Sequence, residues 1–290
     1  MFGRHDAQSE IRNLPSGRLM FPTPRDSPYS NFRQIRDAAL NLVYPQDCLV
    51  CNVPVARYQD HGVCYRCWER VLQLRLVPPW CPSCGVPVGT APLEQGETNA
   101  GPMAAAPASL CLKCALQLPP YSGARSFGYY TSELRHLIQA FKFKGRRDLA
   151  RLLAPLIAST YLESWPEREA DGIVPVPLHS KRKRERSYNQ AALLATMVAR
   201  FLRLGCWEKI LARVRHTAPQ IGLTDAERSR NVWKAFKCTQ PALVRRKRLL
   251  LIDDVMTTGA TVASATEALL EAGALRVSVL TIARAVPGVE

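Results

Sequence analysis

The segment LLLIDDVMTTGAT, residues 249–261, places two adjacent carboxylates directly after a run of apolar residues. If the run is a strand of a parallel sheet, Asp253 and Asp254 lie at its carboxyl end, where open α/β sheets bind ligands. The small and hydroxyl residues that follow would open a helix whose N–H groups can surround a phosphate. Carboxylates repel a phosphate unless they serve sugar hydroxyls or a Mg²⁺ ion. The segment therefore predicts a site for a phosphorylated sugar, whereas a capped turn explains only one Asp and one Thr.

Four pairs of cysteines with the spacing C-x-x-C form the second chemical feature of the chain. Two such turns together supply the four thiolates of a closed tetrahedral metal site. Eight ligands make two structural zinc sites, because an all-cysteine site leaves no open position for a catalytic water. Sequential pairing of the turns is the simplest assignment, and an interleaved pairing stays open. The expected ligands are Cys48, Cys51, Cys64, Cys67, Cys81, Cys84, Cys111 and Cys114.

The other cysteines, and a histidine near the pairs, are not expected to bind metal. Cys206 and Cys238 stand apart from the pairs and are expected to be ordinary buried thiols. His61 lies among the ligands, but with eight cysteines available it is expected on the surface. Gly62 and Gly85 suit the tight turns that the cysteine modules need.

Composition limits the class of protein. A chain of 290 residues with 47% hydrophobic residues can fold around one large core and a second small module. The formal charge of +15 favours polyanionic partners such as phosphates or nucleic acid. The chain has neither an apolar run long enough to span a membrane nor the apolar core of a signal peptide, so we expect a cytoplasmic protein without membrane insertion. In a reducing cytoplasm, paired cysteines indicate metal rather than disulfides.

Local composition and the pattern of apolar residues divide the chain into three parts. Residues 1–30 are polar and rich in Pro, Gly and Ser, which predicts a disordered tail. Residues 31–120 would contain a short helix and the cysteine pairs, with a flexible insert over 89–109. Residues 121–290 alternate apolar strands with helical segments. Such alternation predicts an α/β domain in which helices cover a parallel sheet.

The segment FKFKG alternates aromatic and basic residues. We expect a helix that ends here, with Phe141 and Phe143 packed inward, Lys142 and Lys144 complementing the helix dipole, and Gly145 as the stop. The same alternation is compatible with stacking and phosphate contacts on single-stranded nucleic acid.

The acidic segment resembles the phosphoribosyl pyrophosphate (PRPP) motif of type I phosphoribosyltransferases. In that motif apolar residues precede two acids, an apolar residue and Thr-Thr-Gly-Ala-Thr. The resemblance implies that Asp253 and Asp254 meet the ribose 2′- and 3′-hydroxyls and that Mg²⁺ accompanies the ligand. It assigns the 5′-phosphate to Thr257, Thr258, Gly259, Ala260 and Thr261.

A basic loop follows the strand expected over GIVPVP, which would end at the same sheet edge as Asp253. Such a loop can neutralise a pyrophosphate, although a solvated helix end or a nonspecific nucleic-acid patch explains the charges equally well. Asn189 and Gln190 after it are expected to begin a helix. The basic side chains are Lys181, Arg182, Lys183, Arg184 and Arg186.

The cysteine region, RHLIQAFKFKGRRDLARLLA, VPVPLHSKRKRERSYNQAALLA and PQIGLTDAERSRNVWKAF resemble, in that order, segments of the ComF family. The resemblance covers roughly residues 40–287. It implies a type I phosphoribosyltransferase-like parallel sheet flanked by helices and preceded by a small double zinc ribbon domain with four-cysteine sites. It also implies a role in DNA uptake (natural competence).

The resemblance to type I phosphoribosyltransferases also assigns a lid. In those enzymes a mobile loop after the second strand closes over PRPP, and HTAPQIGLTDAERSRNVWKAF occupies the matching place. Gln220 and Arg228 are its candidate ligand contacts. Thr224 and Glu227 also form a capping box, so one side of the lid would be a helix. His216 is as readily explained as a surface residue.

Two functions follow from these features. The first is an enzyme that transfers the phosphoribosyl group of PRPP, although no segment specifies an acceptor or a catalytic residue. The absence of an N-terminal cysteine argues against a glutamine-dependent amidotransferase. The alternative is a non-catalytic factor that binds single-stranded DNA or nucleotides, with DNA-uptake proteins as partners. A transferase fold that acts only within a complex is a third possibility, so enzymatic activity stays open.

Overall fold

The computed structural model describes residues 46–55, 62–88, 109–167, 170–178, 188–215, 234–286 and 288–289. Its strands are β1 (Gln46–Asp47), β2 (Pro54–Val55), β3 (Gly123–Tyr129), β4 (Gly172–Pro175), β5 (Gly205–Cys206), β6 (Leu211–Arg213), β7 (Phe236–Cys238), β8 (Arg248–Met256) and β9 (Arg276–Arg284). Its helices are α3 (Tyr65–Gln73), α4 (Leu112–Leu116), α5 (Ser132–Phe143), α6 (Leu149–Ser164), α8 (Gln190–Leu202), α10 (Pro241–Val244) and α11 (Ala260–Glu271).

Several predictions from the sequence lie outside these residues. They are the disordered tail over residues 1–30, the short helix before the first cysteine, nearly all of the insert over 89–109, the surface position of His61, the basic loop and the lid.

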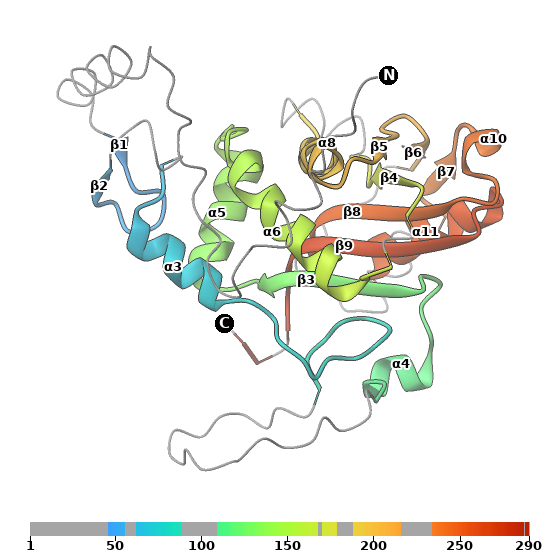
Figure 1. The fold of residues 1–290 in the computed structure, drawn as a ribbon, viewed down its shortest axis with the longest axis horizontal. Coiled ribbons are helices and arrows are strands. Elements are labelled where there is room, and N and C mark those ends of the chain that lie inside the picture. Colours follow the sequence, from blue (N-terminus) through green and yellow to red (C-terminus); the bar gives the residue numbers. More distant parts are fainter. Residues whose placement is uncertain are drawn as a thin grey trace, which may run out of the picture.

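A five-stranded sheet in the order β3-β9-β8-β4-β5 forms the centre of the molecule (Figure 1). Every neighbouring pair of strands in it is parallel. Strand β8 is the middle strand, and its partner β4 runs level with it, with Pro175 opposite Ile252. The backbone N–H of Val176 then donates to the carbonyl of Ile252 at 2.9 Å. The carboxyl ends of β4 and β8 therefore meet at one edge of the sheet, as the sequence predicts.

Helices cover both faces of the sheet, because alternate residues of the central strands point to opposite sides. On one face Leu250 and Ile252 of β8 lie in the core cluster that contains α6 and α8. On the other face Leu249 and Leu251 lie in the cluster that contains α11. Figure 1 shows α6 and α8 beside the sheet. The prediction of a parallel sheet flanked by helices is confirmed.

The first cysteine module packs against the sheet domain. It consists of the β1–β2 hairpin and helix α3, which lies beside α5 (Figure 1). Arg70 of α3 and Glu133 of α5 form an ion pair at 3.3 Å. Cys67 and Trp68 share a core cluster with Phe127 of β3.

The second cysteine module, which contains Cys81, Cys84, Cys111 and Cys114, lies directly on strand β3. The backbone N–H of Ala124 donates to the carbonyl of Ser83 at 2.8 Å. Gly85 has a φ of +71°, and a Cβ added there would lie 2.3 Å from the Ala124 carbonyl oxygen. Only glycine fits that turn, which explains the residue that the sequence places directly after Cys84. Both modules are thus packed on the α/β unit, while the boundary near residue 120 stays a prediction.

Helix α5 ends as the sequence predicts but not with the predicted packing. Lys144 is its C-cap and Gly145 follows with a φ of +67°. Phe141 is fully buried, whereas the prediction that Phe143 packs inward is wrong, because Phe143 is 67% exposed. Residues two positions apart on a helix point to nearly opposite sides, so only one of the two rings can face the core.

The two unpaired cysteines differ in exposure. The prediction of a buried thiol is confirmed for Cys238, whereas Cys206 is only half-buried. Burial raises the pKa of the Cys206 thiol to about 11, so this thiol stays protonated near neutral pH.

In the part of the chain that the structure describes, no helix is both long and apolar enough to cross a membrane.

Candidate functional site

The acid pair lies near the carboxyl end of the central strand. Asp253 is level with Thr281 of β9, and the strand ends three residues later at Met256. Both aspartates are half-buried, and the backbone N–H of Asp254 donates to Oδ1 of Asp253 at 2.8 Å. The strand, acid pair, loop and helix follow one another as the sequence predicts. The two carboxylates are thus held at the ligand-binding edge of an open parallel sheet.

The surroundings of Asp253 disfavour its ionisation. Burial raises the pKa of Asp253 to about 7, and the negative charge of Asp254 adds to that rise. The N–H of Asp254 and the positive charges of Lys142 and Arg213 act in the opposite direction. Asp253 is therefore partly protonated near neutral pH, and a cation bound there would favour its ionised form.

Lys142 of α5 is the residue at this site that the sequence analysis missed. Its Nζ lies 2.8 Å from Oδ1 of Asp254, and the two side chains are only 15% and 13% exposed. The sequence predicts for this lysine only a role at the helix dipole or on nucleic acid, because no local pattern links α5 to the distant strand β8. The ion pair shows that the end of α5 reaches the acid pair.

The start of α8 holds the end of α5 in that position. The Tyr188 hydroxyl donates to the carbonyl of Phe141, and Gln190 Nε2 donates to the carbonyl of Lys142 at 3.3 Å. Asn189 is the N-cap of α8, as predicted, and its Oδ1 accepts from the N–H of Ala191. Gln190, predicted only as a helix start, is buried and also supports the lysine backbone.

The segment after the acid pair, residues 257–259, forms a loop that opens the 12-residue helix α11. Thr258 Oγ1 accepts a hydrogen bond from the N–H of Ala260 at 3.3 Å. Gly259 has a φ of +83° and is the N-cap of α11. The first N–H groups of a helix have no partner within the helix, so this end can bind an anion. We call residues 257–261, for which the sequence predicts phosphate binding, the phosphate loop.

The structure brings together only some of the predicted site residues. The acid pair and the phosphate loop are contiguous at one sheet edge. The pyrophosphate and lid candidates lie outside the described residues; these are Lys181, Arg182, Arg184, Arg186, Gln220 and Arg228.

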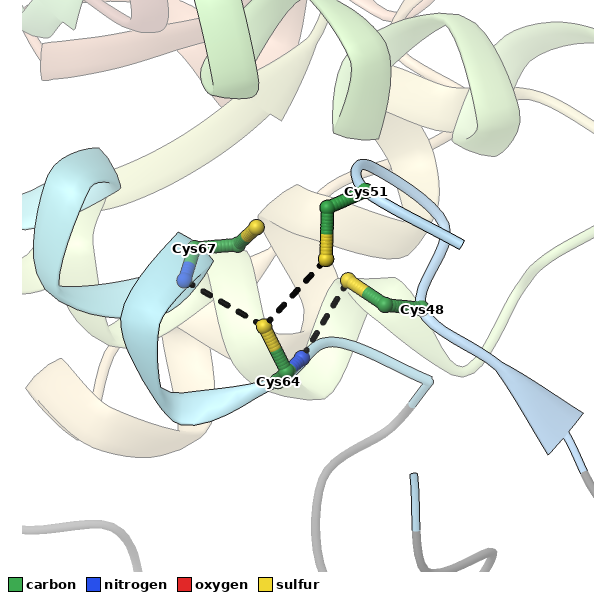
Figure 2. Close-up of side chains that lie close together, drawn as sticks. All are labelled: Cys48, Cys51, Cys64 and Cys67. Atoms are coloured by element: carbon green, nitrogen blue, oxygen red, sulfur yellow. Dashed lines mark hydrogen bonds between the residues drawn. The ribbon is translucent and has the colours of Figure 1, made fainter. Parts of the chain in front are cut away.

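The eight paired cysteines form two groups. The first contains Cys48, Cys51, Cys64 and Cys67, and the second contains Cys81, Cys84, Cys111 and Cys114; in each, all sulfurs lie within 4.8 Å of one another. Figure 2 shows the first group, in which the sulfurs of Cys51 and Cys64 are 3.6 Å apart. A tetrahedral zinc with Zn–S bonds of about 2.3 Å needs sulfurs about 3.8 Å apart. Both groups fit zinc, and the pairing is sequential rather than interleaved.

Backbone N–H groups prepare the first group for metal. The N–H of Cys64 donates to the sulfur of Cys48 at 3.3 Å, and the N–H of Cys67 donates to the sulfur of Cys64 at 3.5 Å (Figure 2). Burial by itself would raise the pKa of the Cys48 thiol, but N–H groups of Cys64, Cys51 and Val50 outweigh it and lower this pKa to about 7. The Cys48 thiol is thus partly ionised at neutral pH, whereas burial raises the pKa of Cys64 and Cys67, and a bound metal ion would favour their thiolate forms.

The second group is more deeply buried than the first, and two arginines lie near it. Cys81, Cys84 and Cys114 are all buried. Arg125 donates from Nη1 to the Pro82 carbonyl at 3.1 Å and is attracted to Cys81 and Cys84. Nε and Nη1 of Arg284 are buried without a hydrogen-bond partner among the described residues. Four thiolates around Zn²⁺ carry two net negative charges, which two guanidinium groups can balance. The donor set therefore fits zinc.

Comparison with known proteins identifies a family model for the cysteine region and relatives that match most of the chain. Residues 39–115 match the family model of the double zinc ribbon domain. The chain is 34% identical over 248 residues to the DNA utilization protein YhgH of Salmonella typhimurium, covering 84% of this chain and 99% of that protein. It is 31% identical to competence protein F of Haemophilus influenzae, covering 82% and 96%.

This chain belongs to the ComF family. The competence protein ComFC of Bacillus subtilis is a more distant relative, 26% identical over 78% of this chain and 85% of that protein. Among solved structures, the glutamine PRPP amidotransferase of B. subtilis complexed with ADP and GMP aligns at 22% identity with a TM-score of 0.30. The alignment covers 47% of this ComF chain and 26% of the amidotransferase, so this chain spans about a quarter of that enzyme.

The metal content of the purified protein tests the two cysteine groups. We expect about two zinc ions per chain, because each group supplies a complete set of four thiolates. Cys51→Ser and Cys111→Ser should each retain about one zinc, because each removes a ligand from a different group. Inductively coupled plasma mass spectrometry of dialysed protein measures both values. Less than about one zinc per wild-type chain would contradict the assignment.

The thermal stability of Asp253→Asn tests the strain in the acid pair. The Asp253 pKa is about 7 in the fold against about 3.9 in the unfolded chain. The fold therefore favours protonated Asp253, and wild-type stability falls as pH rises through this interval. Without ligand, the variant should melt roughly 3 °C or more above wild type at pH 8 and by a smaller margin at pH 6.

Asp171→Asn provides a control of opposite sign for the same scanning calorimetry. Hydrogen bonds from Arg248 lower the Asp171 pKa, so this carboxylate stabilises the fold at pH 8 and loses that effect as pH falls. Its substitution should lower the melting temperature. A melting temperature of Asp253→Asn below that of wild type at pH 8 would contradict the raised pKa.

Proposed function

We propose that this ComF-family protein binds PRPP or a related phosphoribosyl ligand, together with Mg²⁺, at the carboxyl edge of β8. The observation that carries the proposal is the contiguity of Asp253 and Asp254 with the phosphate loop at the start of α11. Carboxylates accept hydrogen bonds from vicinal hydroxyls, and a helix N-terminus accepts a phosphate. A ribose 5-phosphate carries both kinds of group on one molecule.

The charges around the acid pair support a ligand that brings both hydroxyls and a cation. Asp253 ionises with difficulty beside Asp254. Hydroxyl donors and Mg²⁺ would each stabilise the ionised pair, whereas a bare phosphate would oppose it. Lys142 forms an ion pair with Asp254. On ligand binding its ammonium becomes available for the anionic groups next to the ribose.

Phosphoribosyl transfer is the reaction that such a complex could support. A nucleophile attacks the anomeric carbon, the bond from that carbon to the pyrophosphate oxygen breaks, and pyrophosphate leaves with the electron pair. Negative charge then grows on the leaving group, and positive side chains nearby stabilise it. The candidates for this role are Lys142 and the basic residues Lys181, Arg182, Arg184 and Arg186. The proposed location is the cytoplasm, because a reducing compartment keeps the eight cysteines free to bind zinc.

Titration calorimetry with PRPP and Mg²⁺ tests the proposal. The double variant Asp253→Asn with Asp254→Asn should bind PRPP roughly a hundredfold more weakly, because it loses two charge-assisted hydrogen bonds. Asp171→Asn, at the opposite end of the sheet, is the matched control and should keep wild-type affinity. Zinc content should be unchanged in all three proteins. Absence of PRPP binding by the wild type, with both zinc ions present, would refute the proposal.

Binding of single-stranded DNA is the second candidate function. It is favoured by the formal charge of +15 and by the names of two relatives, a DNA utilization protein and a competence protein. Fluorescence anisotropy with a labelled oligonucleotide should show affinity that falls at least tenfold between about 50 and 200 mM salt, since phosphate contacts release counterions. The double aspartate variant should bind the oligonucleotide no more weakly than wild type. Binding that does not respond to salt would contradict this function.

A further inference from the structure

We propose that the second four-cysteine site is part of the phosphoribosyl site. In this proposal the zinc-bound module holds the phosphate loop in place, and Lys113, between two of the ligands, adds a positive charge for the sugar phosphate. The inference rests on the proposed function and adds a residue and a positioning element to it. Four observations support it.

The first observation is a direct contact between the module and the loop. Lys113 Nζ donates to the carbonyl of Thr258 at 3.3 Å, although the two residues are 145 positions apart in the chain. Lys113 lies in α4, which begins after the ligand Cys111 and contains the ligand Cys114. Two metal ligands within one turn of the lysine fix its backbone when zinc is bound. A five-residue helix would have little stability without such support.

The second observation is that the loop rests on a buried tyrosine next to the module. Tyr121 is 6% exposed and shares a core cluster with Cys114 and Met256. A Cβ added at Gly259 would lie 3.2 Å from the Tyr121 hydroxyl oxygen and 2.9 Å from Cε of Met256. The backbone at the start of α11 is therefore packed tightly against residues that share a core cluster with the cysteines. Movement of the module would move this support.

The third observation is the position of Arg284, a buried cation at the end of the strand beside the loop. It is the last residue of β9 and lies opposite Met256, the last residue of β8. Arg284 is 6% exposed, and its Nε and Nη1 atoms have no hydrogen-bond partner among the described residues. Met256 approaches Gly259 and shares a core cluster with Cys81, Cys84 and Cys114. A buried positive charge thus lies next to a residue that supports the loop.

The fourth observation is the contrast with the first cysteine group. Cys48 and Cys67 belong to the other core cluster, with Phe127 and Leu134, on the side of the sheet that α6 and α8 cover. None of the contacts described for the first group reaches the phosphate loop. The chain therefore contains two chemically similar zinc sites, of which one touches the ligand edge, and this difference allows a comparison within one protein.

Titration calorimetry with PRPP and Mg²⁺ on the full-length zinc-loaded protein tests the role of Lys113. Lys113→Met should lower PRPP affinity roughly tenfold, because it removes one ammonium from the phosphate region. Lys247→Met removes the same charge from the opposite end of β8 and should bind PRPP as wild type does. Equal affinity of Lys113→Met and wild type would overturn the role of this residue.

Hydrogen exchange of the phosphate loop without ligand tests the positioning role independently of PRPP. Amides of residues 257–261 should exchange at least threefold faster in Cys111→Ser than in Cys51→Ser, each variant containing about one zinc ion. Equal exchange would overturn the coupling. If Cys111→Ser does not fold, Lys113→Met takes its place in this measurement, with Lys247→Met as its control. Should the wild type not bind PRPP, the proposed function fails, and the exchange rates alone decide whether the module holds the loop.

Discussion

The burial of strand β8 on both faces is the constraint on which the rest of the structure depends. Leu250 and Ile252 pack under α6 and α8, and Leu249 and Leu251 pack under α11. Each such side chain contributes about 1.5 to 3 kcal/mol when fully buried, so a shift of register would be costly. The first charged residue after this run is Asp253. The core thus determines where the carboxylates emerge.

The placement of acids at that edge is electrostatically unfavourable by itself. Burial and the charge of Asp254 raise the pKa of Asp253, and Lys142 of α5 forms an ion pair with Asp254. The buried Gln190 and the Tyr188 hydroxyl hold the backbone of that helix end. A partner that brings hydroxyl donors and a cation would favour the ionised form of Asp253. This is the physical link between the fold and the proposed ligand.

The cysteine modules are built into the fold rather than appended to it. Ser83 and Gly85 contact strand β3 directly, and Arg125 and Arg284 bring positive charge to the more buried cysteine group. A small module of this kind gains folding free energy from its metal. Because the second module also lies at the phosphate loop, its metal stabilises the ligand edge as well as itself.

The sequence alone determined the local patterns: the C-x-x-C turns, the apolar strand that ends in two acids, the loop and helix after it, and the alternation that makes a parallel sheet. These could be predicted because each depends on residues close together in the chain. It left the pairing of the cysteine turns open and gave the wrong orientation for Phe143. Only the tertiary structure revealed Lys142 beside Asp254 and Lys113 beside Thr258. Both contacts join distant segments, and they exist because the helices and the cysteine modules pack at particular positions on the sheet.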